Sequence, residues 1–143
     1  MFGRKKRRIT RLLIVEDEPL VAFDTEHFLQ EAEYEIVATL DRVADAIAAI
    51  ERGPAIDLVL VDVSLSDGSG VDVARAAHAA NVPVMFVTGH CPDGGREVAN
   101  GCLAKPYSQR DLLAAIGVIE AVLEGKAAPK RLPGGFTLFA DAA

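Results

Sequence analysis

The sequence predicts a doubly wound α/β fold around a five-stranded parallel sheet. From residue 11 to residue 123, short apolar runs alternate with stretches in which apolar residues recur at helical spacing. The chain has 143 residues, of which 50% are hydrophobic and 25% charged, so it can bury a core of single-domain size. This composition excludes a largely disordered, collagen-like or coiled-coil chain. Repeated strand–helix units are expected to be joined by right-handed crossovers.

Five apolar runs supply the strands. The clearest is Leu58-Val59-Leu60-Val61, because four consecutive apolar residues suit a parallel strand that helices cover on both faces. The predicted strands span residues 12–15, 35–40, 58–61, 84–87 and 102–104.

Helices are expected between these strands. Pro19 suits the first turn of the first helix, and Asp41 is a candidate N-cap for the second, which Gly53-Pro54 ends. The segment 64–70 is expected to be a loop, and the helix between Thr88 and Lys105 has room for at most two turns. The predicted helices span residues 19–32, 42–52, 71–80, 96–100 and 108–123.

The chain is expected to divide into three parts. Residues 1–10 form a basic extension, for which a solvated, mobile terminus is expected; residues 11–124 form the domain, and 125–143 a flexible tail in which Phe136-Thr-Leu-Phe139 could dock. No effector domain is expected after the last helix. No signal peptide or membrane span is recognisable, so a cytoplasmic protein is expected. A monomer is also expected.

Charge and cysteine content exclude several classes of function. The net charge of −6 argues against direct DNA binding, which needs a cationic face. Cys91 and Cys102 lack the spacing of a zinc site or a disulfide framework, so reduced thiols are expected.

Chemically active side chains follow the predicted strands at their carboxyl ends, where α/β folds place their sites. Glu16 and Asp17 end the first strand, Asp62 the third, Thr88 the fourth and Lys105 the fifth. With the flavodoxin-like strand order 2-1-3-4-5, the three acids converge and would raise one another's pKa without a cation. Mg²⁺, with Mn²⁺ as a substitute, prefers such oxygen ligands. A metal, an ammonium and a hydroxyl beside an aspartate indicate a phosphoryl site.

Each residue alone has a simpler interpretation. Glu16 and Asp17 could cap the following helix, Asp62 could form a turn, Thr88 could be structural and Lys105 solvated. Their placement at the ends of different strands of one sheet favours the phosphoryl site.

Four segments resemble the signature segments of the response-regulator receiver domain of two-component signalling: LLIVEDEP, LVLVDVSLSDGSG, VMFVTG and LAKPY. The resemblance implies phosphorylation of Asp62 from a phosphohistidine on a sensor histidine kinase or a phosphotransfer protein. Glu16, Asp17, Asp62 and the backbone carbonyl of Ser64 would hold Mg²⁺. Thr88 and Lys105 would contact the phosphoryl oxygens.

Two features depart from the common receiver pattern. Cys102 occupies the position where most receivers have a Tyr or Phe that rotates on activation. The Gly-rich segment 89–100 is short, and we expect it to open easily in the free protein and to become ordered on phosphorylation. The run Phe86-Val-Thr88-Gly89 resembles a subgroup of single-domain alphaproteobacterial receivers linked to the general stress response, in which His90 could tune phosphoryl lifetime.

Three other functions fit the sequence less well. An interaction module that is never phosphorylated would be expected to lack one of the acids or the lysine. A hydrolase with an aspartate nucleophile would carry Asp-x-Asp on its first strand, unlike Glu16-Asp17. A flavin carrier would need a Ser/Thr/Gly-rich phosphate loop there. The sequence therefore favours a phosphoacceptor switch, rather than an enzyme, with output by protein–protein contact or phosphorelay.

Overall fold

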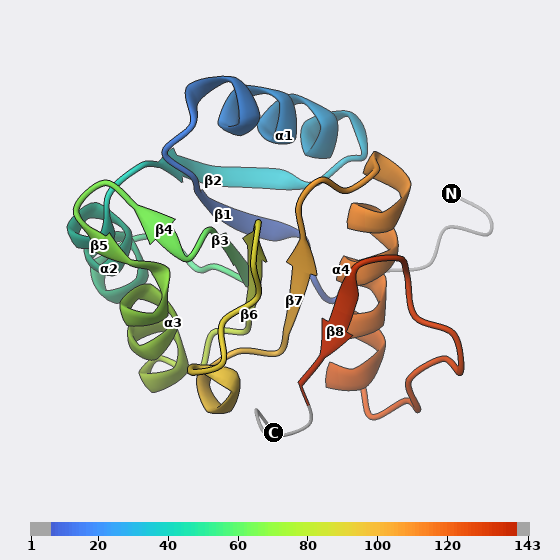
Figure 1. The fold of residues 1–143 in the computed structure, drawn as a ribbon. Coiled ribbons are helices and arrows are strands. Elements are labelled where there is room, and N and C mark those ends of the chain that lie inside the picture. The colour runs from blue at the N-terminus through green and yellow to red at the C-terminus, as the bar shows by residue number, and fades with distance from the viewer. Residues whose placement is uncertain (1–6, 140–143) are drawn as a thin grey trace.

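The computed structural model describes residues 7–139, which form a twisted, mostly parallel sheet between two layers of helices (Figure 1). The strand order is β2-β1-β3-β6-β7-β8, in which only β8 (Phe136–Leu138) is antiparallel, and β4 (Ser64–Leu65) and β5 (Gly68–Ser69) form a separate hairpin. The predicted order of the five parallel strands is therefore confirmed. The parallel strands are β1 (Arg11–Val15), β2 (Glu35–Leu40), β3 (Leu58–Val61), β6 (Val84–Thr88) and β7 (Gly101–Ala104).

The helices follow the predicted pattern closely. They are α1 (Pro19–Glu31), α2 (Val43–Arg52), α3 (Gly70–Ala79), the short 3₁₀ helix η1 (Arg96–Val98) and α4 (Gln109–Leu123). The Ser108 hydroxyl caps α4 by accepting a hydrogen bond from the Asp111 N–H at 3.0 Å. No helix among residues 7–139 is long and apolar enough to cross a bilayer.

Alternate residues of each strand face opposite layers. Leu12 and Ile14 pack in a core cluster with residues of α1 and α4, whereas Leu13 and Val15 pack with residues of α2 and α3. Figure 1 shows these helix pairs on the two faces of the sheet. Burial on both faces explains the unbroken apolar runs 12–15, 58–61 and 84–87, whereas the edge strand β2 is only partly buried and contains Glu35 and Thr39.

The start of α2 differs from the prediction. Its N-cap is Arg42, and the Asp67 carboxylate accepts hydrogen bonds from Val43 N–H at 2.7 Å and Ala44 N–H at 3.4 Å. Asp67 lies between β4 (Ser64–Leu65) and β5 (Gly68–Ser69), so the expected 64–70 loop contains a hairpin. Asp41 is not the N-cap because this hairpin supplies the capping carboxylate from a distant part of the chain.

The described part of the basic extension is packed against the domain. Arg7 donates to the Ala32 carbonyl at 2.9 Å, and its guanidinium lies over the Tyr34 ring. Arg8 and Ile9 N–H both donate to the Glu120 carboxylate, at 2.6 and 2.7 Å, and Ile9 is buried. The expectation of a mobile terminus is therefore wrong for residues 7–10, while the rest of that extension lies outside the described residues.

The tail also joins the sheet. Strand β8 (Phe136–Leu138) pairs antiparallel with β7, and Phe136 and Phe139 are buried. The Phe136 ring lies over Gly101, where a β-carbon would be 2.7 Å from the ring. The docking that the sequence allowed for residues 136–139 is therefore present, and Gly101 leaves room for the aromatic ring at the sheet edge.

The cysteines form a disulfide, Cys91–Cys102. The prediction of reduced thiols is therefore wrong, because count and spacing do not reveal that residue 91 lies over strand β7. Within the segment 89–100, Gly95 and Ala99 are buried, and the helix is as short as predicted. The expectation that this segment opens easily in the free protein stays a prediction.

Candidate phosphoryl and metal site

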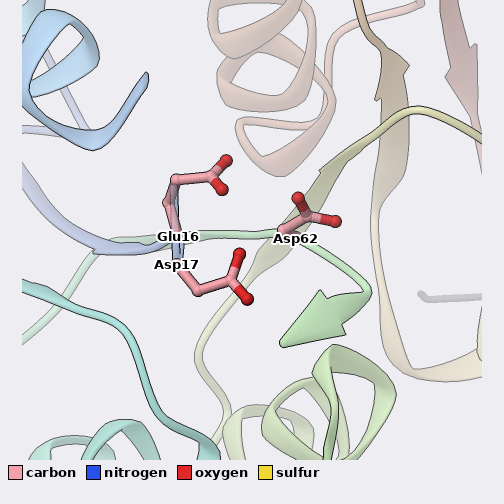
Figure 2. Close-up of side chains that lie close together, drawn as sticks. All are labelled: Glu16, Asp17 and Asp62. Carbon is pink, nitrogen blue, oxygen red and sulfur yellow. The ribbon is translucent and has the colours of Figure 1, made fainter. Parts of the chain in front are cut away.

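Three carboxylates meet at the carboxyl ends of β1 and β3. Glu16 and Asp17 follow β1, Asp62 follows β3, and the register Val15↔Val61 places the residues after each strand side by side. One carboxylate oxygen from each of the three residues lies within 4.8 Å of the other two, and Figure 2 shows the side chains pointing toward a common centre. Glu16 and Asp62 are 6% and 7% exposed, while Asp17 is half-buried.

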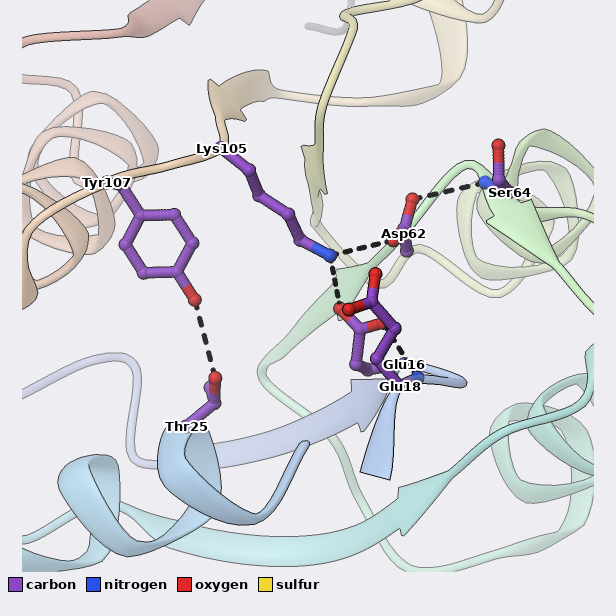
Figure 3. Close-up of polar contacts among 7 residues, drawn as sticks. All are labelled: Glu16, Glu18, Thr25, Asp62, Ser64, Lys105 and Tyr107. Carbon is purple, nitrogen blue, oxygen red and sulfur yellow. Dashed lines mark hydrogen bonds and ion pairs between the residues drawn. The ribbon is translucent and has the colours of Figure 1, made fainter. Parts of the chain in front are cut away.

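Lys105 bridges two of these acids. Its Nζ donates to Glu16 Oε1 at 2.6 Å and to Asp62 Oδ2 at 2.8 Å (Figure 3). Burial acts to lower the pKa of Lys105, but its hydrogen bonds to Asp62 and Glu16 and their negative charges outweigh burial and raise that pKa. The ammonium therefore stays protonated at neutral pH. The predicted position of Lys105 at this edge of the sheet is therefore confirmed. The family resemblance implied phosphoryl oxygens as the partners of Lys105, and the ion pairs with Glu16 and Asp62 were not predicted.

The donor set fits Mg²⁺. Three carboxylates and one ammonium carry a formal charge of −2, which a divalent cation would balance. Opposing oxygens around Mg²⁺ are about 4.2 Å apart, because each Mg–O bond is about 2.1 Å. Neighbouring oxygens in the same octahedron are about 3.0 Å apart, so the three carboxylates, whose ligand oxygens lie within 4.8 Å of one another, would move closer together around a bound ion. The acidic cluster is consistent with a magnesium site, to which water molecules would supply further ligands.

The turn after β3 holds Asp62 in place. The Ser64 N–H donates to Asp62 Oδ1 at 3.1 Å, so both carboxylate oxygens of Asp62 are engaged (Figure 3). Gly70 lies against the same residue, since a β-carbon there would be 2.0 Å from the Asp62 backbone oxygen. The role of the Ser64 carbonyl as a metal ligand stays a prediction.

Glu16 contacts the start of α1 and also belongs to the acidic cluster. Its Oε2 accepts a hydrogen bond from the Glu18 N–H at 3.1 Å, at the start of α1, while Oε1 accepts from Lys105. Contact with the helix start and membership of the acidic cluster are therefore compatible in one side chain.

Thr88 ends β6 beside the acidic cluster. It is 4% exposed, and its backbone oxygen accepts the Lys105 N–H at 2.8 Å, which ties the end of β6 to Lys105. The predicted role of its hydroxyl stays a prediction. His90, two residues further on, is exposed.

Sequence reasoning missed two neighbours of the site, Gly70 and Tyr107. The Tyr107 hydroxyl lies 3.3 Å from Thr25 Oγ1 (Figure 3). Both residues line a cavity of about 10 Å³ together with Glu16 and Asp62. Gly70 and Tyr107 are the last residues of the segments LVLVDVSLSDGSG and LAKPY, so the sequence did contain a signal for both residues.

The comparisons with known proteins agree with this geometry. The family model described as "Response regulator receiver domain" matches residues 12–117. The chain belongs to this family. The receiver is 35% identical over 117 residues to the sensory transduction protein RegX3 of Mycobacterium tuberculosis, covering 78% of this chain and 51% of that protein. It is 30% identical over 113 residues to the phyllosphere-induced regulator PhyR of Methylorubrum extorquens, covering 75% and 42%. The receiver thus spans about half the length of these curated relatives.

Solved receivers share the fold. A CheY-like receiver domain protein from Methanospirillum hungatei matches with a TM-score of 0.72 and 26% identity, over 82% of this chain and 98% of that chain. The receiver domain of a sensor histidine kinase from Pseudomonas aeruginosa matches with a TM-score of 0.64 and 26% identity, over 73% and 92%. That structure has a magnesium ion coordinated in the active site cleft.

Proposed function

We propose that the chain is a phosphorylation switch whose acceptor is Asp62 and whose donor is a phosphohistidine on a sensor histidine kinase or a phosphotransfer protein. The observation that carries the proposal is the meeting of Asp62 with Glu16, Asp17 and the Lys105 ammonium at one sheet edge. A carboxylate oxygen of Asp62 attacks the phosphorus, the bond from phosphorus to the histidine nitrogen breaks, and the histidine keeps that electron pair.

The neighbouring residues have distinct roles in this proposal. Glu16, Asp17, Asp62 and the Ser64 carbonyl hold Mg²⁺, which neutralises phosphoryl oxygens when bound. Lys105 transfers one hydrogen bond from Asp62 to the phosphoryl group, and the Thr88 hydroxyl donates a second. The resulting change at the ends of β6 and β7 alters the surface that a partner protein reads, or the group passes onward in a phosphorelay.

Incubation with Mg²⁺ and acetyl phosphate, followed by intact-mass measurement, tests this proposal. We expect a mass increase of one phosphoryl group in the native chain, none in Asp62→Asn, and a normal increase in the control Asp72→Asn, whose carboxylate is exposed on α3. Full labelling of Asp62→Asn would show that another residue is the acceptor. An unlabelled native chain would favour the unphosphorylated interaction module.

A role in the general stress response is a narrower part of the proposal. It is supported by the run Phe86-Val-Thr88-Gly89 and by the similarity to PhyR. A strain lacking the gene is expected to survive osmotic or oxidative stress less well, and restoration by the Asp62→Asn variant would contradict signalling through that residue.

A further inference from the structure

The Cys91–Cys102 disulfide links the loop that follows β6 to the second residue of β7, between the two strands whose carboxyl ends contribute Thr88 and Lys105. Cys91 lies three residues after Thr88, Cys102 lies three residues before Lys105, and the two cysteines are 11 residues apart in sequence. Strands β6 and β7 pair in the register Thr88↔Ala104. The disulfide therefore closes the segment between the strands into a covalent loop beside the proposed phosphoryl site.

The two sulfurs differ in access. The Cys102 side chain is 0% exposed and packs in the core, whereas Cys91 is only half-buried. The residues around Cys91 in the chain are open to solvent, since His90, Asp93 and Gly94 are exposed. An attacking thiolate would therefore reach the sulfur of Cys91 first, and Cys102 would be the leaving group.

We propose that Cys91–Cys102 is a reversible thiol–disulfide exchange site that takes a dithiol reductant. A thiolate of the reductant attacks Cys91 Sγ, the Cys91–Cys102 bond breaks, and Cys102 leaves as a thiolate and takes up a proton. The second reductant thiolate then attacks its own sulfur in the mixed disulfide and releases Cys91, which also takes up a proton. Two electrons pass to the protein, and the reductant becomes a disulfide.

The link to signalling rests on the proposed function. A receiver that obtains its phosphoryl group from an ATP-dependent kinase works in a compartment where thiols are kept reduced. Disulfides that form in such a compartment are mostly transient, catalytic or redox-sensing. In the oxidised chain the segment 92–99 is held at both ends and cannot respond to movement of Thr88. In the reduced chain it is held only by noncovalent contacts, so phosphorylation can change its order. Oxidation thus uncouples the phosphoryl site from this surface.

Amide hydrogen exchange on the full chain, oxidised or treated with dithiothreitol without denaturant, tests the proposal. Reduction should accelerate exchange in residues 92–99 by about tenfold and leave β3 unchanged. Phosphorylation should then slow exchange in the reduced chain only. Cys91→Ala should behave like the reduced chain with or without dithiothreitol, and Cys102→Ala provides a second variant should Cys91→Ala fold poorly.

The outcomes separate this proposal from the proposed function. Two results would overturn the proposed thiol–disulfide exchange site. One is a disulfide that dithiothreitol cleaves only after the chain has been unfolded. The other is equal amide hydrogen exchange in residues 92–99 of the fully oxidised and fully reduced chains. If reduction accelerated amide hydrogen exchange in residues 92–99 but phosphorylation did not then slow it, the coupling between the disulfide and the phosphoryl site would be overturned. Absence of phosphoryl labelling in both redox states would instead contradict the proposed function. A difference in amide hydrogen exchange between the oxidised and reduced chains would still support a redox-sensitive segment.

Discussion

Gly70 lies so close to Asp62 that a β-carbon on Gly70 would be 2.0 Å from the Asp62 backbone oxygen. The obstacle is main chain rather than a flexible side chain, so Gly70→Ala must displace the strand end that carries the proposed acceptor. We expect a loss of about 1–3 kcal/mol in the free energy of unfolding and slower labelling by acetyl phosphate. Urea titration and intact-mass time courses measure both effects.

Gly117 provides the matched control for this substitution. It lies in α4, and a β-carbon there would meet nothing within 4 Å. Gly117→Ala should stabilise the helix by about 0.5–1 kcal/mol and leave labelling unchanged. Equal labelling rates in both variants would show that Gly70 does not position Asp62.

Removal of Lys105 should make stability depend more strongly on Mg²⁺. Lys105→Ala leaves the buried Glu16 and Asp62 carboxylates without their shared ammonium, which should cost about 3 kcal/mol in metal-free buffer. Because Mg²⁺ can neutralise the same oxygens, it should stabilise this variant more than the native chain. Urea unfolding with EDTA or with Mg²⁺ measures the difference.

Lys126→Ala is the control for loss of a lysine. Lys126 is exposed and pairs with Glu124 at 3.2 Å, so its removal should change stability by less than about 1 kcal/mol with or without Mg²⁺. If Mg²⁺ stabilised Lys105→Ala no more than this control, Lys105 and the metal would not share a site.

Asp57 should contribute to stability in a pH-dependent way. Burial acts to raise its pKa, but hydrogen bonds from the N–H groups of Thr10 and Arg11 outweigh burial and lower the pKa. A lowered pKa in the folded state gives stability that is present above the unfolded pKa, about 3.9, and is lost as pH falls through the folded value.

Asp57→Asn should therefore be less stable than the native chain by about 1 kcal/mol at pH 7, a value kept small because the carboxylate is partly solvated. The difference should shrink as pH falls below about 4. Urea titrations from neutral to acidic pH measure it, with exposed Asp93→Asn as the control. A difference that stays constant down to acidic pH would contradict the role of the carboxylate charge.

Gly95 should control how firmly the segment 89–100 is held. Its φ is +90°, and a β-carbon would lie 3.2 Å from Val71 Cγ1, whereas at Gly94 a β-carbon would meet nothing within 4 Å. Gly95→Ala should cost about 1–2 kcal/mol and accelerate amide exchange in this segment, while Gly94→Ala should leave exchange unchanged. Identical exchange in the two variants would show that the turn at Gly95 does not anchor the segment.

The parallel sheet was predictable because its central strands β1, β3 and β6 are buried on both faces. Runs such as Leu58–Val61 have no polar residue, and the acids and the lysine come directly after the strands, so the strand order alone brings them together. The sequence therefore sufficed to place the three acids and Lys105 at one edge of the sheet.

Contacts between distant parts of the chain could not be predicted in this way. Asp67 caps α2 from a hairpin 24 residues away from Val43 in sequence, and Cys91 meets Cys102 only because its loop folds back over β7. The docking of Phe136 depends on the absence of a side chain at Gly101. None of these relationships produces a periodic pattern, so the local sequence does not reveal them.

Pairing of β8 with β7 has a consequence for self-association. Without β8, the last parallel strand would present unpaired N–H and C=O groups, a template on which strands of other molecules can add. The antiparallel pairs Gly101↔Leu138 and Leu103↔Phe136 occupy that template within the same chain. A polypeptide shortened to the end of α4 is therefore expected to aggregate at concentrations where the longer chain stays dispersed, because its outermost strand would be exposed and apolar.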